Sequence, residues 1–178
     1  MKTATIYTIG HSTRSLDEFL SMLHSFHITT VADVRGFPSS KKFPQYNQES
    51  LKLALHEAGI TYKHLVDLGG RRKAKKDSKN TIWKHVSFRG YADYMETEDF
   101  ENAVQELEEI ALQGTTVYMC SEAVWWRCHR SMVSDYLKAK GWEVLHIMGV
   151  GKAQDHKYTA PAKVKNHKVF YAEEDLAQ

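Results

Sequence analysis

The spacing of apolar residues in the first third of the chain predicts two strand–helix units. Residues 6–9 are apolar or β-branched and predict a first strand. Ser15 stands three positions before Glu18, a capping-box spacing, ahead of apolar residues at helical intervals. Residues 30–34 predict a second strand, and Asn47 is placed to cap the helix that follows it. The chain therefore opens as strand, helix, strand, helix.

The rest of the chain continues this alternation after one interruption. Residues 69–83 have no clear period and predict a long loop. The further expected elements are a strand beginning at 60–62, a helix at 99–113, a strand at 115–119, a helix at about 128–140 and a strand at 143–147. Alternating strands and helices at this spacing predict an α/β fold. We expect a three-layer sandwich in which helices flank a parallel or mostly parallel sheet.

Composition adds the class of protein to this picture. With 178 residues, of which 42% are hydrophobic and 26% charged, the chain is long enough to bury an ordinary core, and we expect a single domain over residues 1–178. No segment reaches the roughly 20 apolar residues of a membrane span, and the N-terminus begins a strand-like pattern instead of a signal peptide. These patterns predict a cytoplasmic protein with no membrane partner. They do not predict the oligomeric state.

Charge is more informative in its distribution than in its sum. The formal net charge is +2, too small to indicate a nucleic-acid partner by itself. Residues 69–76 concentrate positive charge in the predicted loop, where Arg71 and Arg72 are candidates to contact phosphate groups. The same run is also compatible with a solvated loop that binds nothing.

Polar residues gather after the predicted strands. Ligands bind at these strand ends in α/β sheets, because loops converge there and helix N-termini point their donors into the crevice. Three further polar residues, at positions 128–130, begin the helix after the fourth strand, where the helix dipole lowers a thiol pKa and favours anions. The candidates are His11, Asp33, Arg35, Cys120, Glu122, Cys128, His129 and Arg130.

Both cysteines belong to this set, and they fit two chemistries. In a metal site, Cys120, Cys128 and His129 would bind zinc or iron, with Glu122 as a fourth ligand or as the base acting on bound water. The spacing of these residues is not a standard zinc pattern. In a thiol site, Cys128 or Cys120 would be the nucleophile and His129 or His11 the base. We expect the two thiols to be reduced.

A third chemistry uses neither thiol nor metal. Glu122 and Asp33 would transfer protons or stabilise a cationic transition state, while Arg35 and Arg130 hold an anionic group. The residues leave all three chemistries open. They favour an enzyme, with hydrolysis of a nucleotide or a nucleic-acid-like substrate as the first hypothesis.

Aromatic and basic residues near these strand ends supply the substrate contacts of this hypothesis. Trp126 is a candidate stacking platform for a base, and Arg89 is a candidate aimed at the crevice. The alternative hypothesis is a non-catalytic nucleotide or nucleic-acid binding module that uses the basic loop and the tryptophans. A third interpretation gives Cys128, His129 and Arg130 only the role of holding a helix in place.

Several motifs in fixed order resemble those of a known family. They are residues 8–12 (TIGHS), 33–35 (DVR), 68–70 (LGG), 88–95 (FRGYADYM) and the block from Met119 to Arg130 that contains CSE and CHR. Together they resemble the DUF488 family, a domain of unknown function, over about residues 5–148. The resemblance implies an α/β core without a settled activity, followed by a C-terminal extension at 149–178. One departure is Trp125, which stands where the family pattern usually has proline.

Overall fold

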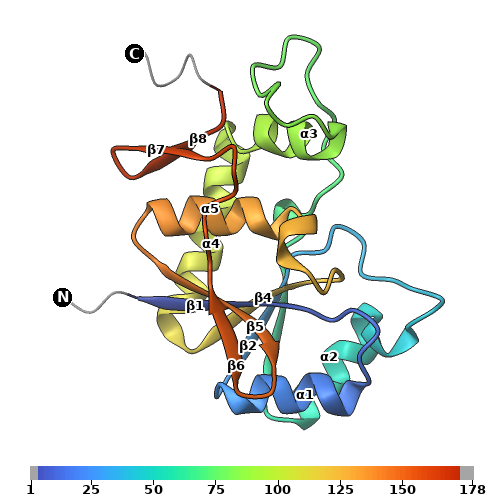
Figure 1. The fold of residues 1–178 in the computed structure, drawn as a ribbon. Coiled ribbons are helices and arrows are strands. Elements are labelled where there is room, and N and C mark those ends of the chain that lie inside the picture. The colour runs from blue at the N-terminus through green and yellow to red at the C-terminus, as the bar shows by residue number, and fades with distance from the viewer. Residues whose placement is uncertain (1–3, 173–178) are drawn as a thin grey trace.

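The computed structural model describes residues 4–172, in which helices cover both faces of a six-stranded sheet (Figure 1). The strand order is β3–β2–β4–β1–β5–β6. The first five strands are parallel, and β6 is antiparallel to β5. The strands are β1 Thr5–Gly10, β2 Thr30–Asp33, β3 Thr61–His64, β4 Thr116–Cys120, β5 Glu143–Gly149 and β6 Lys152–Asp155. This architecture confirms the predicted α/β sandwich with a mostly parallel sheet.

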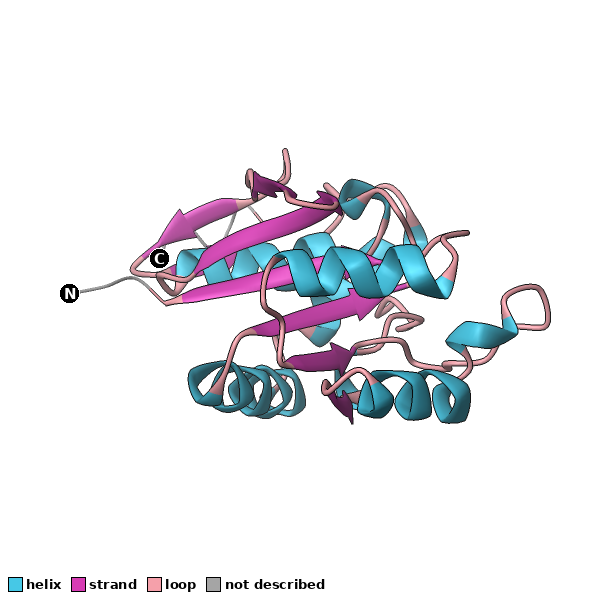
Figure 2. Cartoon of the chain, turned by 90° about the horizontal axis from the view of Figure 1, so that it is seen from below, coloured by secondary structure: helices cyan, strands magenta, loops and turns pink. Residues whose placement is uncertain are grey.

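The helices divide between the two faces. They are α1 Leu16–Ser25, α2 Gln48–Glu57, α3 Val86–Tyr94, α4 Glu98–Gln113 and α5 Arg130–Ala139. Helices α1 and α2 pack on one face, and α4 and α5 pack on the other, with α3 at the end of the second layer (Figure 1). Figure 2 gives the same sheet from below, with its strands side by side.

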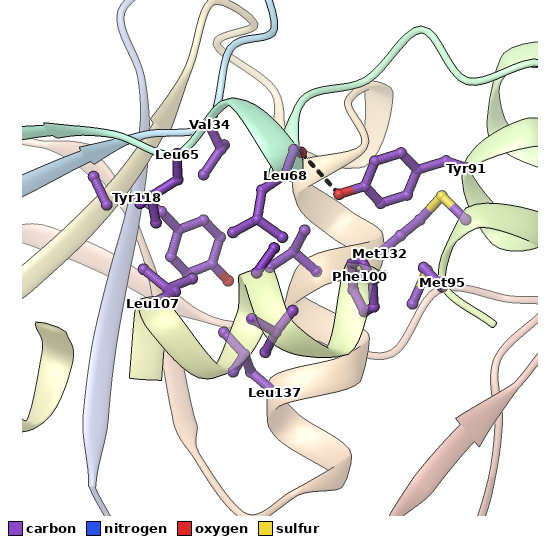
Figure 3. Packing of buried hydrophobic residues seen from close by; sticks show 14 of the residues in the cluster. Val34, Leu65, Leu68, Tyr91, Met95, Phe100, Leu107, Tyr118, Met132 and Leu137 are labelled. Carbon is purple, nitrogen blue, oxygen red and sulfur yellow. Dashed lines mark hydrogen bonds between the residues drawn. The ribbon is translucent and has the colours of Figure 1, made fainter. Parts of the chain in front are cut away.

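Each face of the sheet has its own core, because successive side chains of a strand point to opposite sides. In β4, Val117 and Met119 join the core under α1 and α2, whereas Tyr118 and Cys120 join the core under α4 and α5. Figure 3 shows the second core, in which Tyr118 and Leu107 lie beside residues of α5. This alternation turns the Cys120 thiol toward α5.

The helix starts follow the capping pattern in one case and depart from it in another. The Ser15 hydroxyl accepts the backbone N–H of Glu18, which confirms the predicted cap of α1. Asn47 precedes α2, but its side chain does not cap the helix. Its Oδ1 accepts the N–H of Ser40 at 2.6 Å and fastens the preceding loop instead. The expected cap was therefore wrong, because a competing backbone donor lies within reach of the same oxygen.

Residues beyond the fifth strand have more regular structure than their sequence suggested. The strand β6 extends the main sheet, and β7 Lys163–Lys165 pairs with β8 Lys168–Phe170 in a separate hairpin. All four residues of β6 are exposed, so an alternation of apolar and polar side chains was absent from the sequence. The C-terminal segment thus contributes to the sheet within the described residues.

None of the helices within residues 4–172 has the length and apolar character needed to span a membrane.

The strand order fixes where a ligand site can form. The chain leaves β1 and β2 through α1 and α2 on one face, and it leaves β4 through α5 on the other. Because β4 lies between β1 and β2, the connections diverge on both sides of its carboxyl end. A crevice opens at such a switch point.

Candidate functional site

A cavity of about 800 Å³ lies at the carboxyl ends of β1, β2 and β4. Most of the strand-end residues singled out from the sequence reach it. Its walls include His11, Arg35, Arg71, Cys120, Glu122, Cys128 and His129, together with Phe37, Phe43, His85, Phe88, Tyr91 and Arg127. The divergence of the chain around β4 therefore gathers acid, thiol, imidazole and guanidinium groups in one space.

The two thiols lie together at the base of this cavity. Cys120 ends β4, and Cys128 stands two residues before α5. Their sulfur atoms are 3.0 Å apart and hydrogen-bonded, and both cysteines are free. The exposed fractions are 2% for Cys120 and 8% for Cys128, so a ligand reaches Cys128 more readily.

Cys128 is the thiol whose surroundings favour the anion. Its pKa is lowered, chiefly by the hydrogen bond from Cys120, while burial acts in the opposite direction and the backbone N–H of Arg130, 3.5 Å away, lowers it further. The pKa of Cys120 is raised well above the ordinary thiol value by burial and by Cys128. When both are thiols, Cys128 donates to Cys120, which donates to the Glu122 carbonyl. When Cys128 ionises, the Cys120 S–H must turn to it as donor, because a thiolate only accepts.

His129 is held so that one ring nitrogen faces the Cys128 sulfur. Its Nε2–H donates to the backbone carbonyl of Val34 at 3.1 Å, which leaves Nδ1 with a lone pair 3.4 Å from the Cys128 sulfur. Burial lowers the pKa of His129, so the imidazole is neutral near pH 7. A neutral Nδ1 beside a thiol is an acceptor for its proton. The close approach of Gly70 supports this pose, since a Cβ there would lie 3.1 Å from Nδ1.

Arg130 is buried, and its guanidinium holds the loop between the two cysteines. It donates to the carbonyl of Glu122 at 2.9 Å and to the hydroxyl of Thr8 at 3.0 Å, and 1% of the residue is exposed. Arg130 is not a wall residue of the cavity. No carboxylate within residues 4–172 forms an ion pair with this cation. The structure thus places it behind the site instead of in contact with a ligand.

A chain of hydrogen bonds joins Arg130 to a distant carboxylate. The Thr8 hydroxyl bonds to Nδ1 of His146, whose Nε2 bonds to Nδ1 of His156 at 2.8 Å, and Nε2 of His156 bonds to Asp135 at 2.8 Å. Arg130 only donates and the Asp135 carboxylate accepts from His156, so a neutral His156 would accept from His146, and His146 from Thr8. We call these five residues the buried donor chain.

Groups from the C-terminal segment and the cysteine loop surround the buried donor chain. Asp135 also accepts from Thr159 and from the Tyr171 hydroxyl, the latter at 2.9 Å. The indole of Trp125 stacks on the His146 ring with centroids 4.5 Å apart. Burial lowers the pKa of His146 to about 2, which keeps that ring neutral. These residues are far apart in the chain, and no local sequence pattern connects them.

Asp33 and Arg35 form an ion pair that orients the arginine. The guanidinium donates to both carboxylate oxygens at 2.9 and 2.8 Å, and Tyr62 donates to the same carboxylate at 2.6 Å. Asp33 is fully buried and does not line the cavity, whereas Arg35 does. The geometry makes Asp33 a positioning residue for Arg35, with both of its oxygens engaged.

His11 faces the same arginine as a neutral acceptor. Its Nδ1–H donates to the Ser12 carbonyl at 2.9 Å, so Nε2 accepts from Arg35 at 3.4 Å. Burial lowers the pKa of His11 to about 4, with the charge of Arg35 acting in the same direction. The ring also stacks on Tyr46. His11 therefore completes the cavity wall as an uncharged group near pH 7.

Glu122 lines the cavity from an exposed loop. Its side chain is exposed, while its backbone carbonyl is held by Arg130. This carbonyl approaches β1 so closely that a Cβ on Gly10 would lie 1.6 Å from the oxygen. Only glycine at position 10 allows the loop to pass there.

The structure divides the candidate substrate contacts into two groups. Arg71 lines the cavity, but Arg72, Arg89 and Trp126 do not. Arg72 lies over the ring of Tyr94 and donates to backbone carbonyls, and Arg89 donates to the Trp83 carbonyl. Trp126 is 53% exposed and packs edge-on against Trp125.

Sequence reasoning missed a set of aromatic and basic wall residues. They are Phe37, Phe43, His85, Phe88 and Arg127. Phe37 is 76% exposed at the mouth of the cavity. The rule that ligands bind at the carboxyl ends of strands pointed to Arg35, and it applies equally to the loop after Arg35. It could therefore have identified Phe37 in that loop. Nothing in the local pattern pointed to His85, which the long loop brings back to the site.

The FRGYADYM motif proves to be the anchor of the basic loop. Asp93 accepts from the backbone N–H of Lys75, from Ser78 and from Asn80. A Cβ on Gly90 would lie 1.9 Å from the Arg72 carbonyl, so the loop packs directly on the helix backbone. The motif therefore fixes the loop that delivers Arg71 to the cavity.

The geometry gives the metal hypothesis no complete ligand set. Within residues 4–172, no group of three or more His, Cys, Asp or Glu side chains is arranged to hold a metal ion. Cys120, Cys128 and His129 are adjacent, but they are not among any such group. The side chains of residues 4–172 therefore offer no ready-made ligand set for zinc or iron.

Comparison with known proteins identifies the family. No curated protein and no solved structure matches the chain. The family model described as "Domain of unknown function DUF488" matches residues 15–137, which include α1 and most of α5 and every cavity wall residue except those at the end of β1. The chain belongs to the DUF488 family.

Proposed function

We propose that the protein is a thiol-dependent hydrolase that acts on a nucleotide or a similar anionic substrate through Cys128. The observation that carries this proposal is the environment of the Cys128 sulfur, which faces a hydrogen-bonding thiol, a helix N-terminal N–H and a neutral imidazole nitrogen at the base of an open cavity. All three neighbours either stabilise a thiolate or accept its proton.

The reaction would proceed in two displacements. His129 Nδ1 takes the proton of Cys128, and the sulfur forms a bond to the electrophilic atom of the substrate while the leaving group departs with its electron pair. The imidazolium gives its proton to that leaving group. Water then breaks the bond to sulfur, and Glu122, which lines the cavity on an exposed loop, accepts the proton from water. The Cys128 sulfur leaves as a thiolate and recovers the proton held by Glu122, which restores the starting thiol and carboxylate.

The cavity walls favour a substrate that combines negative charge with a flat ring. Arg71 and Arg127 supply guanidinium groups suited to phosphate or carboxylate, and Arg35, which is paired with Asp33, adds further N–H donors. Phe37 and Phe88 supply aromatic surface on which a base can stack. This combination supports a nucleotide more than an apolar substrate.

The test is hydrolysis of a panel of nucleotides and nucleotide esters by matched variants. Cys128→Ser is expected to lower turnover by on the order of 10³ or more, because the nucleophile is lost. Cys120→Ser is the control, and it retains turnover within about tenfold, since a serine hydroxyl still donates to the thiolate. Glu122→Gln is expected to cost about 10²-fold or more. Turnover that survives Cys128→Ser unchanged would refute a nucleophilic role.

The basic loop supports a second candidate, a nucleic-acid binding surface. The side chains of Arg71, Lys73, Lys75 and Lys76 are exposed, on a loop held in place by Asp93. Binding through such groups releases counterions, so the affinity for single-stranded oligonucleotides should fall steeply between about 50 and 200 mM salt. Affinity that ignores salt, or survives replacement of these four residues by Ala, contradicts this candidate.

A further inference from the structure

We propose that Cys120 and Cys128 together form a dithiol centre that reduces small disulfides bearing carboxylate or phosphate groups, and that becomes an intramolecular disulfide in doing so. This activity rests on the nucleophilic Cys128 of the proposed function. It differs from hydrolysis because it requires both thiols.

The fold, and not the spacing of the cysteines in the chain, creates the pair. Cys120 ends β4 and Cys128 follows a seven-residue loop, and the guanidinium of Arg130 closes that loop by binding the Glu122 carbonyl. The sulfurs are 3.0 Å apart, so a bond between them needs an approach of only about 1 Å. When one of two thiols this close forms a mixed disulfide with a substrate, the other is positioned to attack that sulfur and displace the substrate thiol.

The two thiols have different roles by burial. Cys128 is the more exposed and lines the cavity, so it meets the substrate first. Its thiolate attacks one sulfur of the disulfide RSSR′, forms a mixed disulfide with RS, and releases R′S⁻ with the electron pair of the broken bond. No other oxidant is involved, since the substrate disulfide accepts the two electrons.

Formation of the mixed disulfide prepares Cys120 for the second step. Burial is the first cause of its raised pKa, and the next two causes are the hydrogen bond and the charge of the neighbouring Cys128 thiolate. Both of these disappear when Cys128 becomes a neutral disulfide. Cys120 then attacks the Cys128 sulfur, its proton leaves with RSH, and the intramolecular disulfide forms. The sum is one dithiol and one RSSR′ converted to one protein disulfide and two small thiols.

Charge at the cavity walls defines the class of disulfide. Arg71 and Arg127 line the cavity, together with Arg35, whose charge is paired with Asp33, and with the acidic residue Glu122. Arg71 and Arg127 attract carboxylates or phosphates next to the disulfide and repel ammonium groups, an effect that salt weakens. A compact anionic disulfide is thus the expected substrate, and a cationic one such as cystamine is the matched poor substrate.

The experiment uses the full reduced chain and the aromatic dicarboxylate disulfide 5,5′-dithiobis(2-nitrobenzoate), whose thiolate product is coloured. The wild-type protein should release two equivalents of this product and end lighter by two hydrogen atoms in the intact mass. Protein that instead gains two aryl-thiol adducts would overturn the proposal, because each thiol would then have reacted alone.

Single variants separate the two steps. Cys120→Ser should release one equivalent and retain one adduct on Cys128, and Cys120→Ala serves the same purpose if the serine variant folds poorly. Cys128→Ser should react more slowly than wild type by at least about tenfold, because the remaining thiol of Cys120 is 2% exposed and its burial, the first cause of its raised pKa, persists in the variant. Equal rates for the two single variants would contradict the assignment of Cys128 as the attacking thiol.

The substrate class is tested by charge. Cystamine should react about tenfold or more slowly than the dicarboxylate at low salt, and Arg127→Ala should narrow that gap. No preference between the two disulfides would refute the anionic selectivity. The two proposals fail separately, because the colour and intact-mass measurements use no nucleotide and the hydrolysis assay uses no disulfide.

Discussion

Replacement of Thr8 by valine tests whether the buried donor chain stabilises the fold. Thr8 is fully buried on β1, and in the buried donor chain its hydroxyl connects Arg130 to His146. Valine keeps the size and β-branching of threonine but neither donates nor accepts. The substitution therefore removes two hydrogen bonds without opening a cavity.

The magnitude follows from the two groups that lose their partner. One N–H of the buried Arg130 and the Nδ1 lone pair of His146 are left unsatisfied, each at a cost of about 1–3 kcal/mol. The additional apolar group of valine offsets less than about 1 kcal/mol. We expect the free energy of unfolding to fall by about 3 kcal/mol, a large part of the roughly 5–15 kcal/mol typical of a domain. At an m-value of about 2 kcal/mol/M, the urea midpoint falls by about 1.5 M.

The assay is urea unfolding followed by tryptophan fluorescence and by circular dichroism, with two controls. Thr8→Ser keeps the hydroxyl and loses a methyl group, so it should cost only about 1 kcal/mol. Thr5→Val, on the same strand, removes an exposed hydrogen bond to Glu143 and should change stability by less than about 0.5 kcal/mol. If Thr8→Val proves at least as stable as Thr8→Ser, the donor chain does not stabilise the fold as argued.

Three further predictions test the supports of the site. Gly10→Ala should lower stability by about 3 kcal/mol in urea unfolding, since its Cβ would lie 1.6 Å from the Glu122 carbonyl oxygen, and an unchanged midpoint would contradict this approach. Asp93→Ala should release the loop at 71–80 and speed its cleavage by trypsin by about tenfold, measured by the rate of fragment formation against the wild type. His11 has a pKa near 4 in the folded protein and about 6.5 in the unfolded chain. Between pH 6.5 and pH 4 the unfolded chain therefore binds a proton at His11 that the folded protein does not bind, and the free energy of unfolding falls as the pH drops through this range. His11→Asn should reduce this slope by up to about 1.4 kcal/mol per pH unit, and an unchanged slope would show that His11 is not buried as a neutral ring.

The sequence predicted the layers of the fold because apolar periodicity reports burial directly. The five parallel strands and their crossover helices alternate as expected, and α4 matches the helix with the clearest apolar face. Strand β6 escaped prediction because it lies at an edge with every side chain exposed, so backbone pairing alone holds it in the sheet. The local pattern of apolar and polar residues does not indicate backbone pairing of this kind.

The site was predictable only where chain position determines spatial position. The strand-end rule correctly brought His11, Arg35 and Cys120 to one edge, because parallel strands end together. It said nothing about His85, which reaches the cavity through a long loop fixed by Asp93. The rule also does not separate residues that face the cavity from residues behind it, and Arg130 is the clearest case.

The partners of Arg130 explain how its permanent positive charge is tolerated in the interior. A buried guanidinium without a carboxylate partner is costly, and here three hydrogen-bonded groups, Thr8, His146 and His156, connect it to Asp135. Thr159 and Tyr171 of the C-terminal segment also donate to Asp135, so this segment holds the Asp135 end of the buried donor chain. Arg130, at the other end, closes the loop between the two cysteines. Residues outside the span of the family match are therefore expected to influence the reactivity of Cys128.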